Sequence, residues 1–392
     1  MTERGGNAIT RRGKVTTVAD SVYRILTINP GSTSTKASLY QDDVEVWDTN
    51  VVHDVSDLDT FATISEQGPY RRDAVLAAMR DAGYEPTGLD VVVGVGGVGL
   101  AAVESGTYEI NGAMIDDAAV GRYATHPNNL GVIIAKELAE ACGAAAYAAG
   151  MASSEEYQDV AHVGGFVATP RRCVVHMLNT KEVALRYAAS LDRDYNDLNL
   201  VIAHVGGGVS LGAHRKGKVV DGTDGIDQEG PMSPNRPGGA VGLISFMNLC
   251  FKEGATKDTV QKLVMTHGGL LDHLGTADVL EVKRLIKNGD EYAKLVYDAL
   301  LYQVGKYVGA MAAVLVGDVD AIILTGGLMN DGYGVSYVTD MVKWIAPVVT
   351  YPGELEQEAL SAAALRVLRG EAELLTYSGV PVWSGFEYLK RA

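Results

Sequence analysis

The chain has 392 residues, enough for two domains that each bury a core. Its formal net charge is −16, and no basic stripe offsets this charge, which argues against nucleic acid as a partner. Three widely spaced cysteines, Cys142, Cys173 and Cys250, indicate a reducing compartment and no cysteine-held metal cluster, so we expect a cytoplasmic enzyme.

Neither a membrane span nor a signal peptide is predicted. The longest apolar candidate, residues 91–103, is short and broken by four glycines. Residues 1–22 are polar, carry several basic side chains and lack an apolar signal core. We interpret them as a disordered extension.

The first predicted elements surround a turn that is rich in hydroxyl groups. Residues 25–28 are predicted to form a buried strand, and residues 36–40 alternate like a second strand. The turn between them, residues 29–35, has the sequence Asn-Pro-Gly-Ser-Thr-Ser-Thr. Successive N–H groups and hydroxyl donors in such a turn suit phosphate, and Lys36 supplies positive charge. No helix follows, so the turn is not a Walker A loop, and taken alone it could be an ordinary polar hairpin.

A second glycine-rich segment matches a different nucleotide motif. Residues 94–99, Gly-Val-Gly-Gly-Val-Gly, follow a predicted strand at 89–93 and fit the G-x-G-x-x-G pattern of dinucleotide-binding folds. That fold needs a helix directly after the glycines, and residues 100–108 are too short to form one before their own glycine. We therefore disfavour a Rossmann domain.

Three helices are predicted in the first half of the chain, at residues 70–82, 128–142 and 178–190. His126 and His176 lie directly upstream of the second and the third helix. From that position, the His126 side chain could project from the helix N-terminus into a cleft.

The pattern of strand, glycine turn and strand recurs about half a chain later. Residues 198–204 are predicted to form a strand, and residues 205–210 a turn with three consecutive glycines. A third glycine turn, Gly326-Gly327, follows a predicted strand at 321–324. Two such modules suggest a duplicated architecture. Three glycine turns can converge on one nucleotide between two domains, which is the arrangement of actin-like ATPases and sugar kinases.

A stiff polar loop follows the second module, and mostly helices follow the loop. Residues 224–239 contain three prolines, two Asp, one Glu and a single arginine, Arg236. One fixed cation of this kind suits phosphoryl transfer, because it stabilises charge in the transition state. Residues 246–301 are predicted to be helical with a break near Gly268, and a last helix covers 356–369.

Several of these blocks, in this order, resemble those of the butyrate kinases. They are I-N-P-G-S-T-S-T-K at 28–36, H-P-N-N-L-G at 126–131, H-M-L-N-T-K at 176–181, A-H-V-G-G-G-V-S at 203–210, E-G-P-M-S-P-N-R at 229–236, T-G-G-L at 325–328 and Y-P-G-E at 351–354. The resemblance implies two ribonuclease-H-like α/β domains of the actin-like ATPase fold, each with a mixed five-stranded sheet, and ATP in the cleft between them. It also implies reversible phosphoryl transfer between ATP and a short-chain carboxylate, giving an acyl phosphate and ADP, with Mg²⁺ as cofactor and a homodimer.

The resemblance further implies roles for single residues. The catalytic residues would be Arg236, His176, His126 and Asn29, and Mg²⁺ would be placed by Asn29 and Glu358. The nucleotide would be held by Gly31, Ser32, Thr33, Ser34, Lys36, His204, Gly206, Gly207, Gly208, Ser210, Gly326 and Gly327. The carboxylate pocket would be lined by Val95, Gly96, Gly97, Gly150 and Glu229. A structural role is equally open for His204, and a loop-ordering role for Glu229.

Two positions depart from the family pattern. Val95 stands where the family has an arginine before a Gly-Gly pair, and Gly150 stands where it has an aspartate. At both positions this chain lacks a polar side chain that the family has. The family's arginine would form a charge-assisted hydrogen bond with the substrate carboxylate. Three hypotheses follow: a carboxylate kinase of the butyrate kinase type for a short-chain or branched acid, a diverged kinase with another acceptor, and a catalytically silent nucleotide-binding protein.

We expect two domains without a low-complexity linker. The first covers residues 23–185 and the second residues 186–355, and the C-terminal helical segment 356–392 returns to the first. Closure of the two domains over substrate is expected, because phosphoryl transfer must exclude water.

Overall fold

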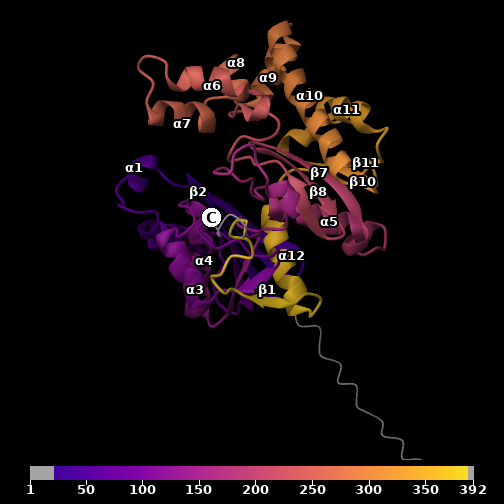
Figure 1. The fold of residues 1–392 in the computed structure, drawn as a ribbon. Coiled ribbons are helices and arrows are strands. Elements are labelled where there is room, and N and C mark those ends of the chain that lie inside the picture. Colours follow the sequence, from indigo (N-terminus) through magenta and orange to yellow (C-terminus); the bar gives the residue numbers. More distant parts are fainter. Residues whose placement is uncertain (1–21, 387–392) are drawn as a thin grey trace, which may run out of the picture.

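The structure, a computed structural model, describes residues 22–386 and is organised around two β-sheets (Figure 1). The predicted α/β architecture with two sheets is confirmed. The extension predicted over residues 1–22 lies, except for Val22, outside the described residues. In Figure 1, the indigo and purple elements of the first sheet occupy the lower part of the view, and the second sheet and its helices lie above them.

The first sheet has seven strands in the order β12-β5-β6-β4-β1-β2-β3. They are β1 (Arg24–Pro30), β2 (Ser34–Gln41), β3 (Val44–Val52), β4 (Val91–Val95), β5 (Thr107–Glu109), β6 (Ala145–Ala149) and β12 (Leu374–Thr376). The sheet thus exceeds the expected five strands, because β5 and β12 extend it beyond β6. Each of these two strands has only 3 residues, too few to show an alternating pattern in the sequence.

The second sheet has the predicted five strands, in the order β11-β10-β7-β8-β9. They are β7 (Asn199–Val205), β8 (Val209–Arg215), β9 (Lys218–Gly222), β10 (Ala321–Gly326) and β11 (Val348–Pro352). β7 pairs antiparallel with β8 and parallel with β10, just as β1 pairs antiparallel with β2 and parallel with β4. The duplication inferred from the two strand–turn–strand modules is therefore present in the pairing of both sheets.

Helices cover both faces of the second sheet. Leu200 and Ile202 of β7 pack with α5 (Met177–Ser190), whereas Val201 and Ala203 pack on the other side with α10 (Glu291–Val314). α11 (Gly332–Val342) adds to the side of α10. The expected boundary between residues 185 and 186 falls inside α5. Because α5 packs on the second sheet, we propose that the second domain begins before this helix.

The first sheet is also covered on both faces. One face packs against α2 (Gly68–Asp81), α3 (Gly112–Val120) and α4 (Leu130–Cys142), and short α1 (Val55–Leu58) follows β3. The other face packs against α12 (Glu356–Leu368), which brings the chain back from the second sheet. Within the described part of the segment 356–392, α12 ends at Leu368 and β12 follows at the edge of the first sheet.

No helix directly follows the glycines after β4. The next helix, α3, begins at Gly112, after β5. The G-x-G-x-x-G pattern therefore lacks the helix that a Rossmann fold requires, as the sequence indicated.

The region predicted as one long helical stretch consists of separate helices. They are α6 (Leu243–Cys250), α7 (Lys257–Thr266), α8 (Gly269–Leu274), α9 (Val279–Lys287) and α10. The predicted break near Gly268 separates α7 from α8. In Figure 1, α6, α7 and α8 lie at the upper left of the view, with α1 beneath them. Among the described residues, no helix is long and apolar enough to cross a membrane.

Candidate active site

The turn between β1 and β2 directs free N–H groups to its outer side. Ser32 and Thr33 are exposed, and within residues 22–386 their N–H groups donate to no protein acceptor. The Thr33 carbonyl is already occupied, since it accepts from the His53 N–H at 2.8 Å. Unpaired donors of this kind are what an anion-binding turn requires, and phosphate binding here stays a prediction.

The carboxylates that meet this turn come from the start of α12. Nδ2 of Asn29 donates to Oε2 of Glu356 at 2.9 Å. Nζ of Lys36 lies 3.4 Å from the same oxygen and 3.7 Å from Oε2 of Glu354. Sequence reasoning assigned neither of these two glutamates to the site. They place carboxylate oxygens beside the β1–β2 turn, which is predicted to bind phosphate.

Glu358, the predicted metal-placing residue, lies elsewhere. Its carboxylate is near Tyr40, whose pKa is raised chiefly by burial and then by Glu358. Both Glu356 and Glu358 stand in the first turn of α12, but two positions correspond to about 200° around a helix. The sequence showed an acid in this turn and could not show which side of the helix meets Asn29.

The short segment from Gly353 to Glu356 joins the three glycine turns. Gly326 and Gly353 exchange two backbone hydrogen bonds, of 3.0 and 3.1 Å. A Cβ added to Gly206 would lie 3.1 Å from Oε1 of Glu354, so the β7–β8 turn approaches the same carboxylate that faces Lys36. The turns that sequence reasoning assigned to one nucleotide are thus brought to one place in the fold.

Two histidines stack beside the β7–β8 turn. The rings of His176 and His204 are 3.9 Å apart and 12° from parallel. His176 Nδ1 lies 2.7 Å from Ser210 Oγ, and a Cβ on Gly208 would lie 3.2 Å from the ring. Burial lowers the pKa of His204 to about 4 and lowers that of His176 well below its ordinary value. Both rings are therefore neutral at pH 7.

His204 is the less accessible of the two rings. It is 2% exposed, and its Nδ1 lies 2.9 Å from Nδ2 of Asn179. The Asn179 amide also donates to Thr325 Oγ1 at 3.0 Å and accepts from the Leu355 N–H at 3.1 Å. This network fits the structural role that was left open for His204, with His176 in front of it.

Arg236 lies within electrostatic reach of both predicted site histidines. Desolvation chiefly lowers the pKa of His126 and of His176, and the positive charge of Arg236 acts in the same direction on each. Nη1 of Arg236 donates to the Gly225 carbonyl at 2.9 Å. Its buried Nε has no hydrogen-bond partner among the described residues. The guanidinium is therefore held by one edge while a donor remains free.

His126 belongs to the half of the molecule that contains the first sheet. It caps the 3₁₀ turn Pro127–Asn129 before α4, and its Nδ1 accepts from the Asn128 N–H at 3.2 Å. Arg236 belongs to the loop after β9 of the second sheet. Arg236 thus lies near one histidine from each half of the molecule.

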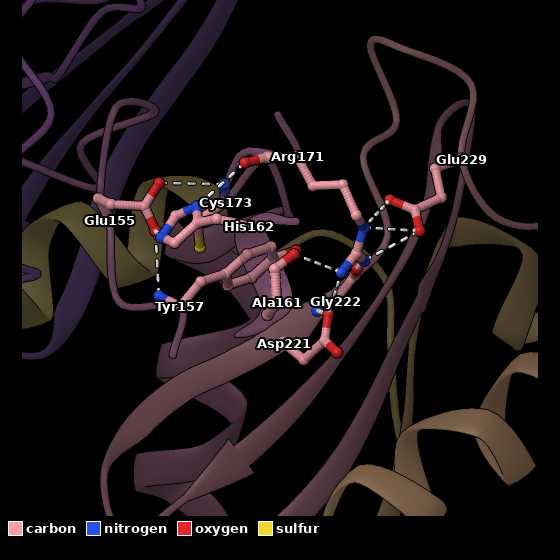
Figure 2. Close-up of polar contacts among 9 residues, drawn as sticks. All are labelled: Glu155, Tyr157, Ala161, His162, Arg171, Cys173, Asp221, Gly222 and Glu229. Atoms are coloured by element: carbon pink, nitrogen blue, oxygen red, sulfur yellow. Dashed lines mark hydrogen bonds and ion pairs between the residues drawn. The ribbon is translucent and has the colours of Figure 1, made fainter. Parts of the chain in front are cut away.

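The Glu229 carboxylate is paired with an arginine that sequence reasoning missed. Figure 2 shows the Arg171 guanidinium between Glu229, Asp221 and the Gly222 carbonyl. Nε of Arg171 lies 3.0 Å from both Glu229 oxygens, and its Nη atoms lie 3.0 Å from Asp221 Oδ1 and 2.6 Å from the Gly222 oxygen. Bidentate pairs of this kind fix geometry strongly. The loop-ordering role that was open for Glu229 fits these contacts better than a place in the carboxylate pocket.

The segment that carries Arg171 is itself held by a buried cluster. Nδ1 of His162 lies 3.0 Å from the Arg171 carbonyl, and Nε2 lies 3.6 Å from Glu155 (Figure 2). Glu155 also accepts from the N–H groups of Tyr157 and Cys173. The connection between β6 and α5 is therefore tied to the loop that contains Arg236.

The predicted acceptor side is apolar and close-packed. Val95 is 8% exposed and belongs to the same buried cluster as Ala149, against which Leu178 packs. Gly150 has φ of +60°, and a Cβ there would lie 2.7–2.9 Å from Leu178 side-chain atoms. An aspartate at position 150 would therefore strain the backbone and displace Leu178.

Gly96 and Gly97 also permit close contact. A Cβ on Gly96 would collide with Met151, and one on Gly97 would lie 2.5 Å from Cα of Asn129. Side chains at these positions would push the β4 turn away from Asn129, which precedes α4. The glycines are thus explained by packing as well as by substrate access.

Comparison with known proteins indicates which family and fold this chain resembles. The family model of the acetokinase family matches residues 168–343. Butyrate kinase 2 of Clostridium acetobutylicum is 40% identical over 355 residues, which cover 91% of this chain and 99% of that protein. Butyrate kinase 1 of the same organism is 40% identical over 356 residues, with 91% and 100% covered.

Solved structures show the same fold. The acetate kinase of Porphyromonas gingivalis superposes with a TM-score of 0.69 at 19% identity, covering 88% of this chain and 100% of that one. The acetate kinase of Entamoeba histolytica gives a TM-score of 0.65 at 14% identity, covering 86% and 97%. At these identities the likeness concerns the fold, which is the actin-like architecture expected from the sequence.

Proposed function

Since this chain belongs to the acetokinase family, we propose that it is a carboxylate kinase of the butyrate kinase type. It transfers the terminal phosphoryl group of ATP reversibly to a short-chain or branched carboxylate, which gives an acyl phosphate and ADP. The observation that carries this proposal is the convergence of three glycine turns with Arg236, His126 and His176.

The nucleotide would lie across the three turns. The N–H groups of the β1–β2 and β7–β8 turns would hold its phosphates, and Gly326 and Gly327 would face the adenosine. Arg236 would use the guanidinium donors that Gly225 does not hold to stabilise the equatorial oxygens of the phosphoryl group in transfer. The neutral His126 and His176 would donate hydrogen bonds there without adding charge.

The oxygen ligands near Asn29 fit Mg²⁺. Among the described residues, no group of three or more His, Cys, Asp or Glu could hold a metal alone. Mg²⁺ usually binds through one or two carboxylates together with water and substrate phosphates, so Glu356, Glu354 and Asn29 suffice on the protein side. When bound, Mg²⁺ would neutralise charge on the phosphates.

An apolar acceptor end fits an alkyl chain. Val95 and Leu178 are packed into a buried cluster and bring no charge to this side of the site, so the carbon chain of the acid would lie against an apolar wall. Its carboxylate would be oriented towards Arg236 and the histidines. This favours acids with a longer or branched chain over acetate.

Acyl phosphate formation tests this function directly. We expect the purified protein with ATP, Mg²⁺ and hydroxylamine to form hydroxamate from butyrate, valerate or a branched acid, and less from acetate. Reactions without acid, or with EDTA, should give none. No hydroxamate from any acid, with nucleotide binding intact, would contradict the proposal. In fractionated cells, the activity should be in the cytoplasm, where ATP is available and free thiols such as Cys142, Cys173 and Cys250 persist.

We also propose a homodimer that buries the exposed face of α6. This helix has no buried residue, and Leu243 and Phe251 are 75% and 85% exposed. Ile244 and Met247 lie beside them and are also exposed. Contiguous apolar patches of this kind mark interfaces, and a second copy of the chain offers the same patch to itself.

Light scattering after size exclusion tests the dimer. The wild-type protein should have about twice the 41.5 kDa mass of one chain. The double variant Leu243→Glu/Phe251→Glu should elute as a monomer, because two charges from each chain would be desolvated at the interface. Val120→Glu on α3, also exposed, is the matched control and should remain dimeric. A wild-type monomer, or a dimer that survives the double substitution, would rule out this interface.

A further inference from the structure

One fully buried arginine lies directly behind the β1–β2 turn. The buried residues of α2 are Gly68, Arg71, Val75 and Met79, which form one stripe at helical spacing. Arg71 is 0% exposed, so a charged side chain occupies a position where the pattern calls for an apolar one. Burying a charged side chain there costs free energy unless the charge is hydrogen-bonded or paired.

Arg71 holds the carbonyl groups of the turn. Nη1 donates to the carbonyls of Gly31 and Ser34 at 2.9 and 3.1 Å, and Nη2 donates to that of Ser32 at 2.9 Å. The other edge of the guanidinium is fixed by Gln67, whose Oε1 accepts from Nε at 3.1 Å and from Nη2 at 3.0 Å. These contacts therefore fix three carbonyls of the turn on the side of Arg71, while the N–H groups of Ser32 and Thr33 have no acceptor among the described residues.

The charge of Arg71 is not balanced by the protein. Its neighbour Arg72 forms ion pairs with Asp73 and Glu137, whereas Arg71 has no carboxylate partner among residues 22–386. His53 lies nearby, but a histidine side chain is neutral or positive and cannot balance this charge; burial, and then the Arg71 charge, lower its pKa. Only neutral acceptors bond this cation among the described residues, namely three backbone carbonyls, the Gln67 amide oxygen and the Thr35 hydroxyl. A phosphate at the turn would complete its compensation.

We propose that Arg71 is a positioning residue for the nucleotide phosphates, acting through the backbone of residues 31–34. It shapes the turn so that its N–H groups point to the ligand, and it adds a buried positive charge behind them. This inference rests on the proposed function, in which this turn binds phosphate. It assigns a role to a residue that does not itself touch the nucleotide.

Three variants separate shape from charge. Arg71→Met removes both the hydrogen bonds that shape the turn and the positive charge behind it. The Kd for MgADP measured by calorimetry should then rise roughly 30-fold or more. In Arg71→Lys, the charge remains but one ammonium cannot bond three carbonyls, so the Kd should recover to within about fivefold while kcat stays at least about tenfold low. Arg72→Met, the matched control on the same helix, should match the wild type within about twofold.

Thermal unfolding distinguishes positioning from a merely structural role. A structural role lowers the Tm of the free protein only, whereas a positioning role also reduces the increase in Tm that MgADP produces, because binding energy is lost. If Arg71→Met is folded and binds MgADP within threefold of the wild type, the proposal is wrong. Should it not fold, Arg71→Lys and Gln67→Met decide instead, and wild-type kcat and Kd in both would overturn it. MgADP binding needs no acid, so this test stands even if no carboxylate is phosphorylated.

Discussion

Replacing Arg236 by alanine should lower kcat for acyl phosphate formation by roughly three to five powers of ten, the range seen for single arginines in phosphoryl transfer. The guanidinium has one buried nitrogen without a partner and lies close enough to His126 and His176 to lower their pKa. Its removal takes away the cation on which the transition state depends, while the three glycine turns remain. The Kd for MgATP should therefore change much less than kcat.

Two further variants make this test specific. Arg236→Lys keeps a positive charge but loses the planar fork, so it should recover only a small part of kcat. Arg284→Ala, on the surface of α9 and paired with Glu281, should leave kcat unchanged. A kcat within tenfold of the wild type for Arg236→Ala would remove Arg236 from the reaction.

Gly326→Ala should unfold or strongly destabilise the protein, lowering the free energy of unfolding by roughly 2–5 kcal/mol. Gly326 has φ of +94°, and a Cβ would lie 2.5 and 2.6 Å from the carbonyl carbon and nitrogen of Val205. These are backbone atoms of β7 and cannot move aside alone. The two hydrogen bonds between Gly326 and Gly353 would be lost as the turn shifts, and with them the nucleotide site.

The adjacent Gly327 is the matched control. It is exposed, and a Cβ there meets nothing within 4 Å. Gly327→Ala should therefore unfold at the same urea concentration as the wild type, although its KM for ATP should rise if the adenosine passes over it. Equal stability of the two alanine variants would show that the turn is less constrained than its geometry indicates.

The sequence predicted those parts of the fold that have long local patterns. β1, β2, β7, β8 and β10 alternate or form apolar runs next to glycine turns, so their positions and their duplication could be found. β5 and β12 are held only by pairing with distant strands, and no periodicity within 3 residues reveals them. The number of strands in the first sheet was therefore underestimated.

For the site, sequence reasoning located turns better than side-chain partners. The contact of Glu356 with Asn29 could not be predicted, because the direction of α12 relative to Asn29 is a tertiary property. Glu229 was placed among pocket residues because its partner, Arg171, is far away in the chain. Arg71 did leave a signal, since a charge in the apolar stripe of α2 is unusual, but the carbonyls it binds could not be inferred.

The return of α12 and β12 to the first sheet affects the order in which a growing chain can fold. One face of this sheet, including Ile25, Val91 and Val93, is covered by Leu360 and Ala364 of α12. All strands of the second sheet, by contrast, precede Gly353 in the chain. On the ribosome, the C-terminal half can thus complete its core first, while the N-terminal half keeps an open apolar face until the last residues emerge.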